Sequence, residues 1–213
     1  MPTPKVMIIP VTPFQQNCCL MWEEESRDGV VVDPGGDVPV ILEAIAKAQV
    51  NVREIWLTHG HIDHAGGAAE LAEKLKVEII GPDAADLFLL EGLEESGLKY
   101  GMEGSRNMVP SRWLKQGDEV SVGGLTFEVR HAPGHTPGHV VFFNSEHRFA
   151  LVGDVIFQGS VGRTDLPGGS HETLLQSIHE QILPMGDDVT FLCGHGQPSQ
   201  VGIERQTNPF LQD

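Results

Sequence analysis

The segment THGHIDH, from Thr58 to His64, places three histidines and one aspartate within six residues. The apolar run IWL precedes it at residues 55–57, and a stretch of small residues follows it. Burying imidazole or carboxylate groups without partners costs several kcal/mol, so packing alone gives no reason to gather four of them in one turn. The segment therefore predicts a ligand site, and a metal ion is the first candidate.

The length and composition of the chain suit one globular domain over residues 1–213. Of its 213 residues, 40% are hydrophobic and 21% are charged. No run approaches the ~18 apolar residues of a membrane span, and the first residues lack the pattern of a signal peptide, so we expect a cytoplasmic protein. Cys18, Cys19 and Cys193 form no C-x-x-C pair and are expected to be buried free thiols.

The charge balance is strongly acidic. The chain carries 30 acidic and 14 basic residues, which gives a formal net charge of −16. Such a charge repels a phosphate backbone, and no basic run offsets it. We therefore expect that the protein does not bind nucleic acid, and the lack of a long apolar run predicts that it does not bind a membrane.

Strand and helix patterns alternate along the chain, which is typical of an α/β protein. Short apolar runs between turn residues predict strands within the first 33 residues, and apolar residues at helical spacing predict helices over 38–48 and 65–75. Residues 83–93 predict a further helix, followed by an irregular loop to about residue 112. In the second half we expect strands over 125–133, 139–144, 147–154 and 189–196, and a helix over 170–183.

Four strand-like runs end directly in residues of the kinds that bind metals. These residues are His59, His61, Asp63 and His64 after the first run, His131, His135 and His139 after the second, Asp154 after the third and His195 after the fourth. Because the carboxyl ends of strands gather at one edge of an α/β sheet, the four endings can converge on one pocket. Imidazole and carboxylate without cysteine suit zinc, iron, manganese or nickel, and the set is large enough for two ions.

The spacing of these residues suggests how they divide. In an extended turn, His59 and His61 point to the same side and could hold one ion, while Asp63 and His64 turn toward a second ion. Asp154 has two oxygens to share and could bridge the two ions. For His131 we favour a polar residue at a strand end, and for His139 a partner of a ligand. His147, His171 and His179 are expected at the surface.

The motifs THGHIDH, PGHT, GD and GHG, in this order, resemble those of the metallo-β-lactamase-fold hydrolases. Within that family the sequence is most similar to the glyoxalase II (hydroxyacylglutathione hydrolase) branch, in the short bacterial form that lacks a C-terminal helical domain. The resemblance covers essentially the whole chain, from PVTPFQQNC through VVDPGGD and GDVIFQGSVGRTDLPGG to NPFLQ. It implies an αββα sandwich, in which two mixed β-sheets lie face to face with helices outside.

The resemblance also implies a set of site residues. His59, His61 and His135 would hold a first divalent metal, and Asp63, His64 and His195 a second. Asp154 would bridge the two metals, and both Asp63 and Asp154 would act in catalysis. Zinc is the first choice of metal, and iron or manganese would also fit.

The implied reaction is hydrolysis of S-D-lactoylglutathione, or a similar hydroxyacyl thioester, to the acid and the free thiol. Two cations lower the pKa of a bridging water toward ~7, so a metal-bridging hydroxide would attack the thioester carbonyl. Arg163, in SVGRTD, stands where the family places a basic residue that can meet glutathione. A surface arginine paired with Asp165 is the alternative, and without the C-terminal domain the way in which glutathione is held stays open.

Three other functions are compatible with the motifs. A persulfide dioxygenase of the same fold would hold one Fe(II) with His59, His135 and Asp154, but the complete second ligand set favours the hydrolase. A lactonase or β-lactamase would share the metal chemistry and differ in the pocket walls. A non-enzymatic metal-binding module is disfavoured because structural zinc sites are typically closed and rich in cysteine.

Overall fold

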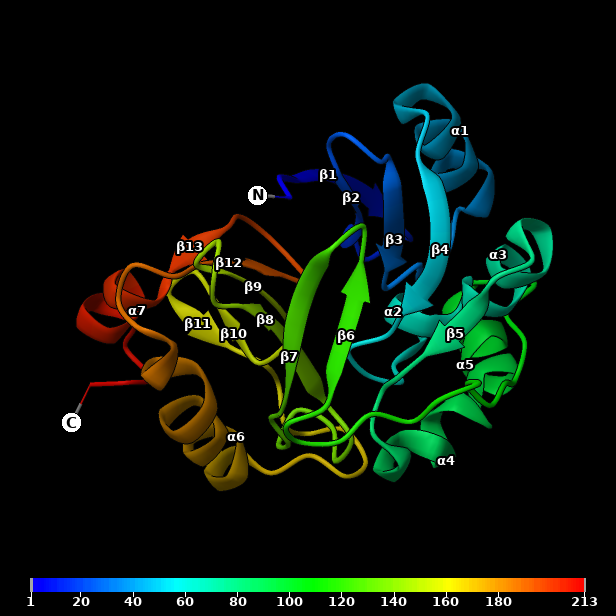
Figure 1. The fold of residues 1–213 in the computed structure, drawn as a ribbon. Coiled ribbons are helices and arrows are strands. Elements are labelled where there is room, and N and C mark those ends of the chain that lie inside the picture. The colour runs from blue at the N-terminus through cyan, green and yellow to red at the C-terminus, as the bar shows by residue number, and fades with distance from the viewer. Residues whose placement is uncertain (1, 213) are drawn as a thin grey trace.

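Two β-sheets lie face to face, and helices cover the outer face of each (Figure 1). The computed structural model describes residues 2–212. Buried apolar side chains form three clusters: one between the sheets and one between each sheet and its helices. The expected αββα sandwich is therefore confirmed.

The N-terminal sheet has the strand order β1-β2-β3-β4-β5. Its strands are β1 (Pro4–Val11), β2 (Gln16–Glu23), β3 (Asp28–Val32), β4 (Asn51–Trp56) and β5 (Glu78–Ile80). The first three strands are antiparallel, and β3, β4 and β5 are parallel. Helices α1 (Val38–Ala48) and α3 (Ala68–Leu75) cover its outer face. Helix α1 buries Val38, Ile41 and Ile45, which recur at helical spacing on one side.

Three differences from the sequence prediction occur between β4 and β6. The helix expected over 65–75 begins only at Ala68, because Gly66 and Gly67 separate it from a short helix, α2 (Ile62–Ala65). The single helix expected over 83–93 is divided into η1 (Ala84–Asp86) and α4 (Leu87–Leu90). A further helix, α5 (Leu93–Tyr100), lies where a loop was expected. Leu93 is almost fully buried in the core, so tertiary packing stabilises a helix that the glutamate-rich sequence did not suggest.

The C-terminal sheet has the strand order β13-β12-β9-β8-β7-β6. Its strands are β6 (Glu119–Val122), β7 (Leu125–His131), β8 (Val140–Asn144), β9 (Phe149–Gly153), β12 (Thr190–Cys193) and β13 (Ser199–Gln200). Strands β12 and β9 are parallel, and the other pairs are antiparallel. A small hairpin, β10 (Ile156–Phe157) and β11 (Ser160–Val161), follows β9.

Helices α6 (His171–Ser177) and α7 (Val201–Thr207) pack on the outer face of the C-terminal sheet. The helix expected over 170–183 begins as α6, continues as a wider turn, η2 (Ile178–Ile182), and ends in η3 (Leu183–Met185). Among residues 2–212, no helix has both the length and the apolar character needed to cross a membrane.

An aromatic cluster fills the space between the two sheets. Trp56, at the end of β4, contacts Phe127 of β7 and Phe142 of β8, with ring centroids 5.6 and 5.2 Å apart. All three side chains are fully buried. Because the sheets are held at a fixed spacing by this packing, the loops at their edges face each other in a defined way. The thiols of Cys18, Cys19 and Cys193 are free and buried, as expected.

Candidate metal centre

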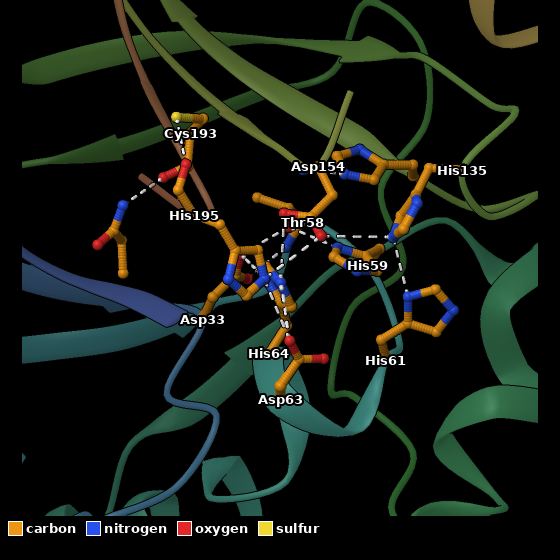
Figure 2. Close-up of polar contacts among 12 residues, drawn as sticks. Asp33, Thr58, His59, His61, Asp63, His64, His135, Asp154, Cys193 and His195 are labelled. Carbon is orange, nitrogen blue, oxygen red and sulfur yellow. Dashed lines mark hydrogen bonds and ion pairs between the residues drawn. The ribbon is translucent and has the colours of Figure 1, made fainter. Parts of the chain in front are cut away.

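The predicted ligands lie at one edge of the sandwich, each after a strand. The segment THGHIDH follows β4, so that His59 and His61 lie in the turn while Asp63 and His64 lie in α2. The other three come from the C-terminal sheet: His135 after β7, Asp154 after β9 and His195 after β12. Figure 2 shows these side chains pointing toward one another. The two sheets therefore both contribute to the centre.

His59, His61 and His135 form a first ligand trio. One nitrogen of each imidazole lies within 4.8 Å of the others. Nδ1 of His61 and Nε2 of His135 are 2.9 Å apart. Three neutral imidazoles at this spacing are a typical donor set for a divalent transition metal.

Asp63, His64 and His195 form a second ligand trio, whose donor atoms also lie within 4.8 Å of one another. Oδ2 of Asp63 lies 3.2 Å from Nε2 of His195 and 3.8 Å from Nε2 of His64. This trio lies toward solvent, because the side chain of His195 is 31% exposed and that of Asp63 17%. Substrate can therefore reach the centre from this side.

Asp154 lies between the two trios (Figure 2). Its Oδ2 atom is 3.6 Å from Nε2 of His135 in the first trio and 3.6 Å from Nε2 of His195 in the second. Its Oδ1 atom is 3.4 Å from Nε2 of His64. A carboxylate in this position can contact ions held by both trios, which is the location that a bridging role requires.

Several polar atoms of the centre are buried and have no hydrogen-bond partner among residues 2–212. They are Nε2 of His59, His61 and His64, and Oδ1 of Asp154. Each such atom costs about 1–3 kcal/mol when it is left unsatisfied in the interior. Nε2 of His61 points away from the centre, because Nδ1 of that ring faces His135 (Figure 2). Cations held by these residues would satisfy the other three atoms. The residues present therefore fit a divalent metal centre.

The electrostatics of the first trio and of Asp154 favour metal binding as well, whereas His64 and His195, despite their burial, have pKa values raised by the neighbouring carboxylates. Burial, together with the neighbouring imidazoles, lowers the pKa of His59 well below its usual range, and the same causes lower the pKa of His61 to about 3. Burial would raise the pKa of Asp154, but the nearby imidazole of His64 outweighs it and lowers the pKa. Neutral imidazoles and ionised carboxylates are the protonation states that metals require.

Asp33 supports the centre and was not predicted. It follows β3, and its Oδ2 atom accepts hydrogen bonds from Oγ1 of Thr58 (2.6 Å) and Nδ1 of His64 (2.9 Å), while Oδ1 accepts from the Thr58 amide (2.7 Å). Thr58 Oγ1 also lies 3.0 Å from Nδ1 of His59. Asp33 is near enough to His59 and His64 to act as a ligand, but its oxygens are occupied, so it orients them instead. The run GVVVD, a strand that ends in a carboxylate, is the same signal that identified Asp154.

Two further histidines from the PGHT region differ in their roles. His139 is fully buried and stacks on His59, with ring centroids 4.7 Å apart. Its Nε2 atom accepts a hydrogen bond of 3.1 Å from the Asp154 amide. It therefore supports ligands, as predicted. His131 is half-buried and its Nε2 bonds to the Pro137 carbonyl at 2.9 Å, so it does not join the centre.

The remaining histidines lie outside the centre. His171 and His179 are exposed on or beside α6, as expected. His147 was expected at the surface but is half-buried, because its amide and its Nδ1 atom both bond to Oδ1 of Asn144.

Arg163 reaches the centre through its backbone. Its carbonyl accepts the hydrogen on Nδ1 of His135 over 2.8 Å, which orients a member of the first trio. Its side chain is 62% exposed and forms two hydrogen bonds with Asp165, of 2.8 and 2.7 Å. The surface pairing considered from the sequence is thus the arrangement that the structure has.

The fold and the centre define a class of protein, and sequence comparison agrees with them. The sequence model of the metallo-beta-lactamase superfamily matches residues 11–195 of this chain. The chain therefore belongs to that family. It is a metal-dependent hydrolase whose histidine and aspartate clusters bind divalent metal.

Particular relatives cover nearly the whole chain. The hydroxyacylglutathione hydrolase GloC of Haemophilus influenzae is 43% identical over 207 residues, which is 97% of each chain. Among solved structures, that of the BLEG-1 B3 metallo-beta-lactamase matches with a TM-score of 0.89 and 32% identity, covering 99% of this chain and 100% of the other. The structure of TTHA1623 in a di-iron-bound form has a TM-score of 0.88 and 34% identity. The match covers 97% of this chain and 100% of the other.

Proposed function

We propose that this protein is a binuclear hydrolase of hydroxyacyl thioesters, which converts S-D-lactoylglutathione to D-lactate and glutathione. The observation that carries the proposal is the pair of ligand trios that share Asp154. The 43% identity to a hydroxyacylglutathione hydrolase over 97% of the chain supports the choice of substrate.

In this proposal the first trio and the second trio would each hold one divalent ion, and Asp154 would serve both sites. Zinc is our first choice because imidazole and carboxylate ligands suit it, and iron or manganese would fit the same donors. A relative that is 34% identical has been solved with two irons, which supports two occupied sites.

The residues of the chain would divide the chemistry as follows. When bound, the ions would supply a water of lowered pKa and an electrophile for the carbonyl oxygen. Asp63 would anchor the second ion, and its carboxylate, on the more exposed side of the centre, would orient the attacking water. Asp154 would hold the two sites together from the buried side. The departing thiolate has a pKa of about 8.5 in free form, so no strong general acid is needed.

Arg163 is the proposed contact for the anionic part of glutathione. The guanidinium lies on the segment whose backbone orients His135, and it is exposed. To bind a substrate carboxylate it would exchange Asp165 for that group. Because an exposed pair contributes little to stability, the exchange costs little.

The experiment that tests the function is hydrolysis of S-D-lactoylglutathione by protein of known metal content. We expect kcat/KM of ~10⁴ M⁻¹s⁻¹ or above for the unmodified chain. His59→Ala should abolish the rate, and His171→Ala, which changes an exposed histidine outside the centre, should leave it intact. A negligible rate from protein that holds both metals would refute the proposed substrate.

A second candidate is β-lactam hydrolysis, which the 32% identity and close structural match to BLEG-1 favour. The metal chemistry would be the same, and the pocket walls would select the acyl group. Assays with a β-lactam and a lactone beside the thioester would rank these activities. Oxygen uptake with glutathione persulfide tests the mono-iron dioxygenase, which would leave the second trio without a role.

A further inference from the structure

The carboxylate of Asp86 is fully buried beside the metal centre, yet it belongs to neither trio. Asp86 ends η1, the short helix that follows β5. Burial raises the pKa of its carboxyl, which three hydrogen bonds oppose. A buried carboxylate of this kind needs strong partners, because its desolvation is costly.

The three partners of Asp86 are all hydrogen-bond donors, and all lie in turns that carry ligands. Oδ2 accepts from the amide of Gly60 at 2.9 Å and from Oγ1 of Thr136 at 2.8 Å. Oδ1 accepts from the amide of Gly138 at 2.6 Å. Gly60 lies between His59 and His61, and Thr136 follows His135. One carboxylate therefore joins the two turns that supply the first trio.

The packing around Asp86 leaves the two turns little freedom. A methyl group at Gly138 would lie 2.7 Å from Cγ of Asp86 and 2.6 Å from the Asp83 carbonyl. The Asp83 amide also donates to the Gly138 carbonyl at 3.0 Å. On the other side, a methyl group at Gly60 would lie 2.8 Å from Cβ of Leu89. Residues 83–89 thus pack closely against both turns.

The second trio has a separate support. Asp63 and His64 lie in α2, where Asp33 bonds to His64, and His195 follows β12. None of the three hydrogen bonds of Asp86 involves a residue adjacent to His64 or His195. Asp86 therefore supports the first trio and not the second, whereas Asp33 bonds directly to His64 and reaches His59 only through Thr58.

We propose that Asp86 is a positioning residue for the first metal alone. By joining the turn of His59 and His61 to the turn of His135, it sets the spacing between imidazoles contributed by different sheets. Loss of its hydrogen bonds lets the two turns separate, which weakens the first site and leaves the second intact. The inference rests on the two-metal centre of the proposed function and does not depend on its substrate.

The test is a titration of the metal-free protein with zinc in competition with a chromophoric chelator, which counts the sites and measures each affinity. Substituting a residue that orients metal ligands typically costs about 10- to 100-fold in affinity, so Asp86→Ala should weaken one of two equivalents by that factor. Asp83→Asn is the matched control, because this carboxylate lies on the same segment but, within the described part of the chain, accepts a hydrogen bond only from the Ala85 amide. It should leave both equivalents unchanged.

A milder variant covers the case in which Asp86→Ala fails to fold. Thr136→Val keeps the shape of the side chain and removes one of the three hydrogen bonds, so the same equivalent should weaken by a smaller factor. Equal weakening of both equivalents, or no weakening, with the protein folded, overturns the inference while the two-metal centre stands. A single zinc equivalent in the unmodified protein would overturn the two-metal centre and the inference with it.

Discussion

Nδ1 of His64 donates a hydrogen bond to Oδ2 of Asp33 over 2.9 Å, and this bond leaves Nε2 of His64 facing the metal centre without a hydrogen-bond partner. A hydrogen bond of this kind fixes both the tautomer and the orientation of an imidazole that binds metal. Asp33 thereby holds the His64 ring in the orientation and tautomer that metal binding needs, without an ion being present.

We expect Asp33→Ala to weaken metal binding by about 10- to 100-fold, mostly at the second trio. Asp33 bonds to His64 directly, whereas it reaches His59 only through Thr58. The measurement is the zinc retained after dialysis against a chelator. Asp28→Ala, at the other end of β3, removes an exposed ion pair with Arg53 and should retain zinc normally. Unchanged zinc retention in Asp33→Ala would show that His64 needs no support.

Gly194→Ala should damage the centre and spare the fold. A methyl group at this position would overlap Oδ1 of Asp154 and lie 2.5 Å from Cε1 of His64, so both side chains would have to move. Because small misplacements of catalytic groups can cost 10²-fold, we expect the hydrolysis rate to fall by about that factor. Initial rates with the preferred substrate, beside circular dichroism, measure both effects.

The matched control for Gly194→Ala is Gly92→Ala. At Gly92 the added methyl group meets its nearest atom, the Phe88 carbonyl oxygen, at an ordinary 3.4 Å. This variant should keep full activity. If Gly194→Ala is as active as Gly92→Ala, the close packing of Gly194 against Asp154 and His64 is not needed for activity.

Phe142→Ala should destabilise the protein by about 3–5 kcal/mol, since it removes a fully buried ring from the cluster between the sheets. Chemical denaturation of both proteins measures the free energy of unfolding. Val40→Ala, on the solvent side of α1, changes a side chain that is 50% exposed and should shift the value by less than about 0.5 kcal/mol. Equal losses in the two variants would argue against the role assigned to the aromatic cluster.

Glu23 should contribute a pH-dependent part of the stability. Its carboxylate accepts the amide of Ser26 at 2.7 Å and that of Glu25 at 3.1 and 3.2 Å, and these bonds lower the pKa of Glu23 from 4.5 to about 2. A carboxyl whose pKa is lower in the folded chain stabilises it fully above pH 4.5, and this contribution disappears as the pH falls through 2.

Titration of the Glu23 carboxyl carbon by NMR should therefore give a midpoint near 2. The difference in unfolding free energy between the unmodified chain and Glu23→Gln should shrink as the pH is lowered from 6 toward 2. A midpoint near 4.5 would mean that the turn after β2 does not hold the carboxylate in solution.

Much of the fold followed from local patterns. Strand-like runs that end in histidine or aspartate marked β4, β7, β9 and β12. β9 is buried on both faces and reads as a continuous apolar run, whereas β7 alternates buried with more exposed residues. The spacing of α1 marked its buried face. The seven expected ligands came together because their strands end at one edge, and the order of the motifs along the chain already implied this.

The supporting residues were harder to predict, since their roles depend on contacts far apart in the sequence. Asp86 bonds to residues 26, 50 and 52 positions away, and its own segment looked like an ordinary helix. Helix α5 was missed because Leu93 is stabilised by a distant core. The side chain of Arg163 pairs with Asp165, and no local pattern could decide between that pairing and a contact with glutathione.

The distribution of the ligands over the two sheets also sets when the centre can form during biosynthesis. His59, His61, Asp63 and His64 leave the ribosome early, but His135, Asp154 and His195 follow only with the second sheet. Until β12 inserts beside β9 and brings His195 into place, the second trio is incomplete. Stable loading of the two proposed metals would therefore be a late event, and an ion captured early would meet only the ligands that the nascent chain already presents.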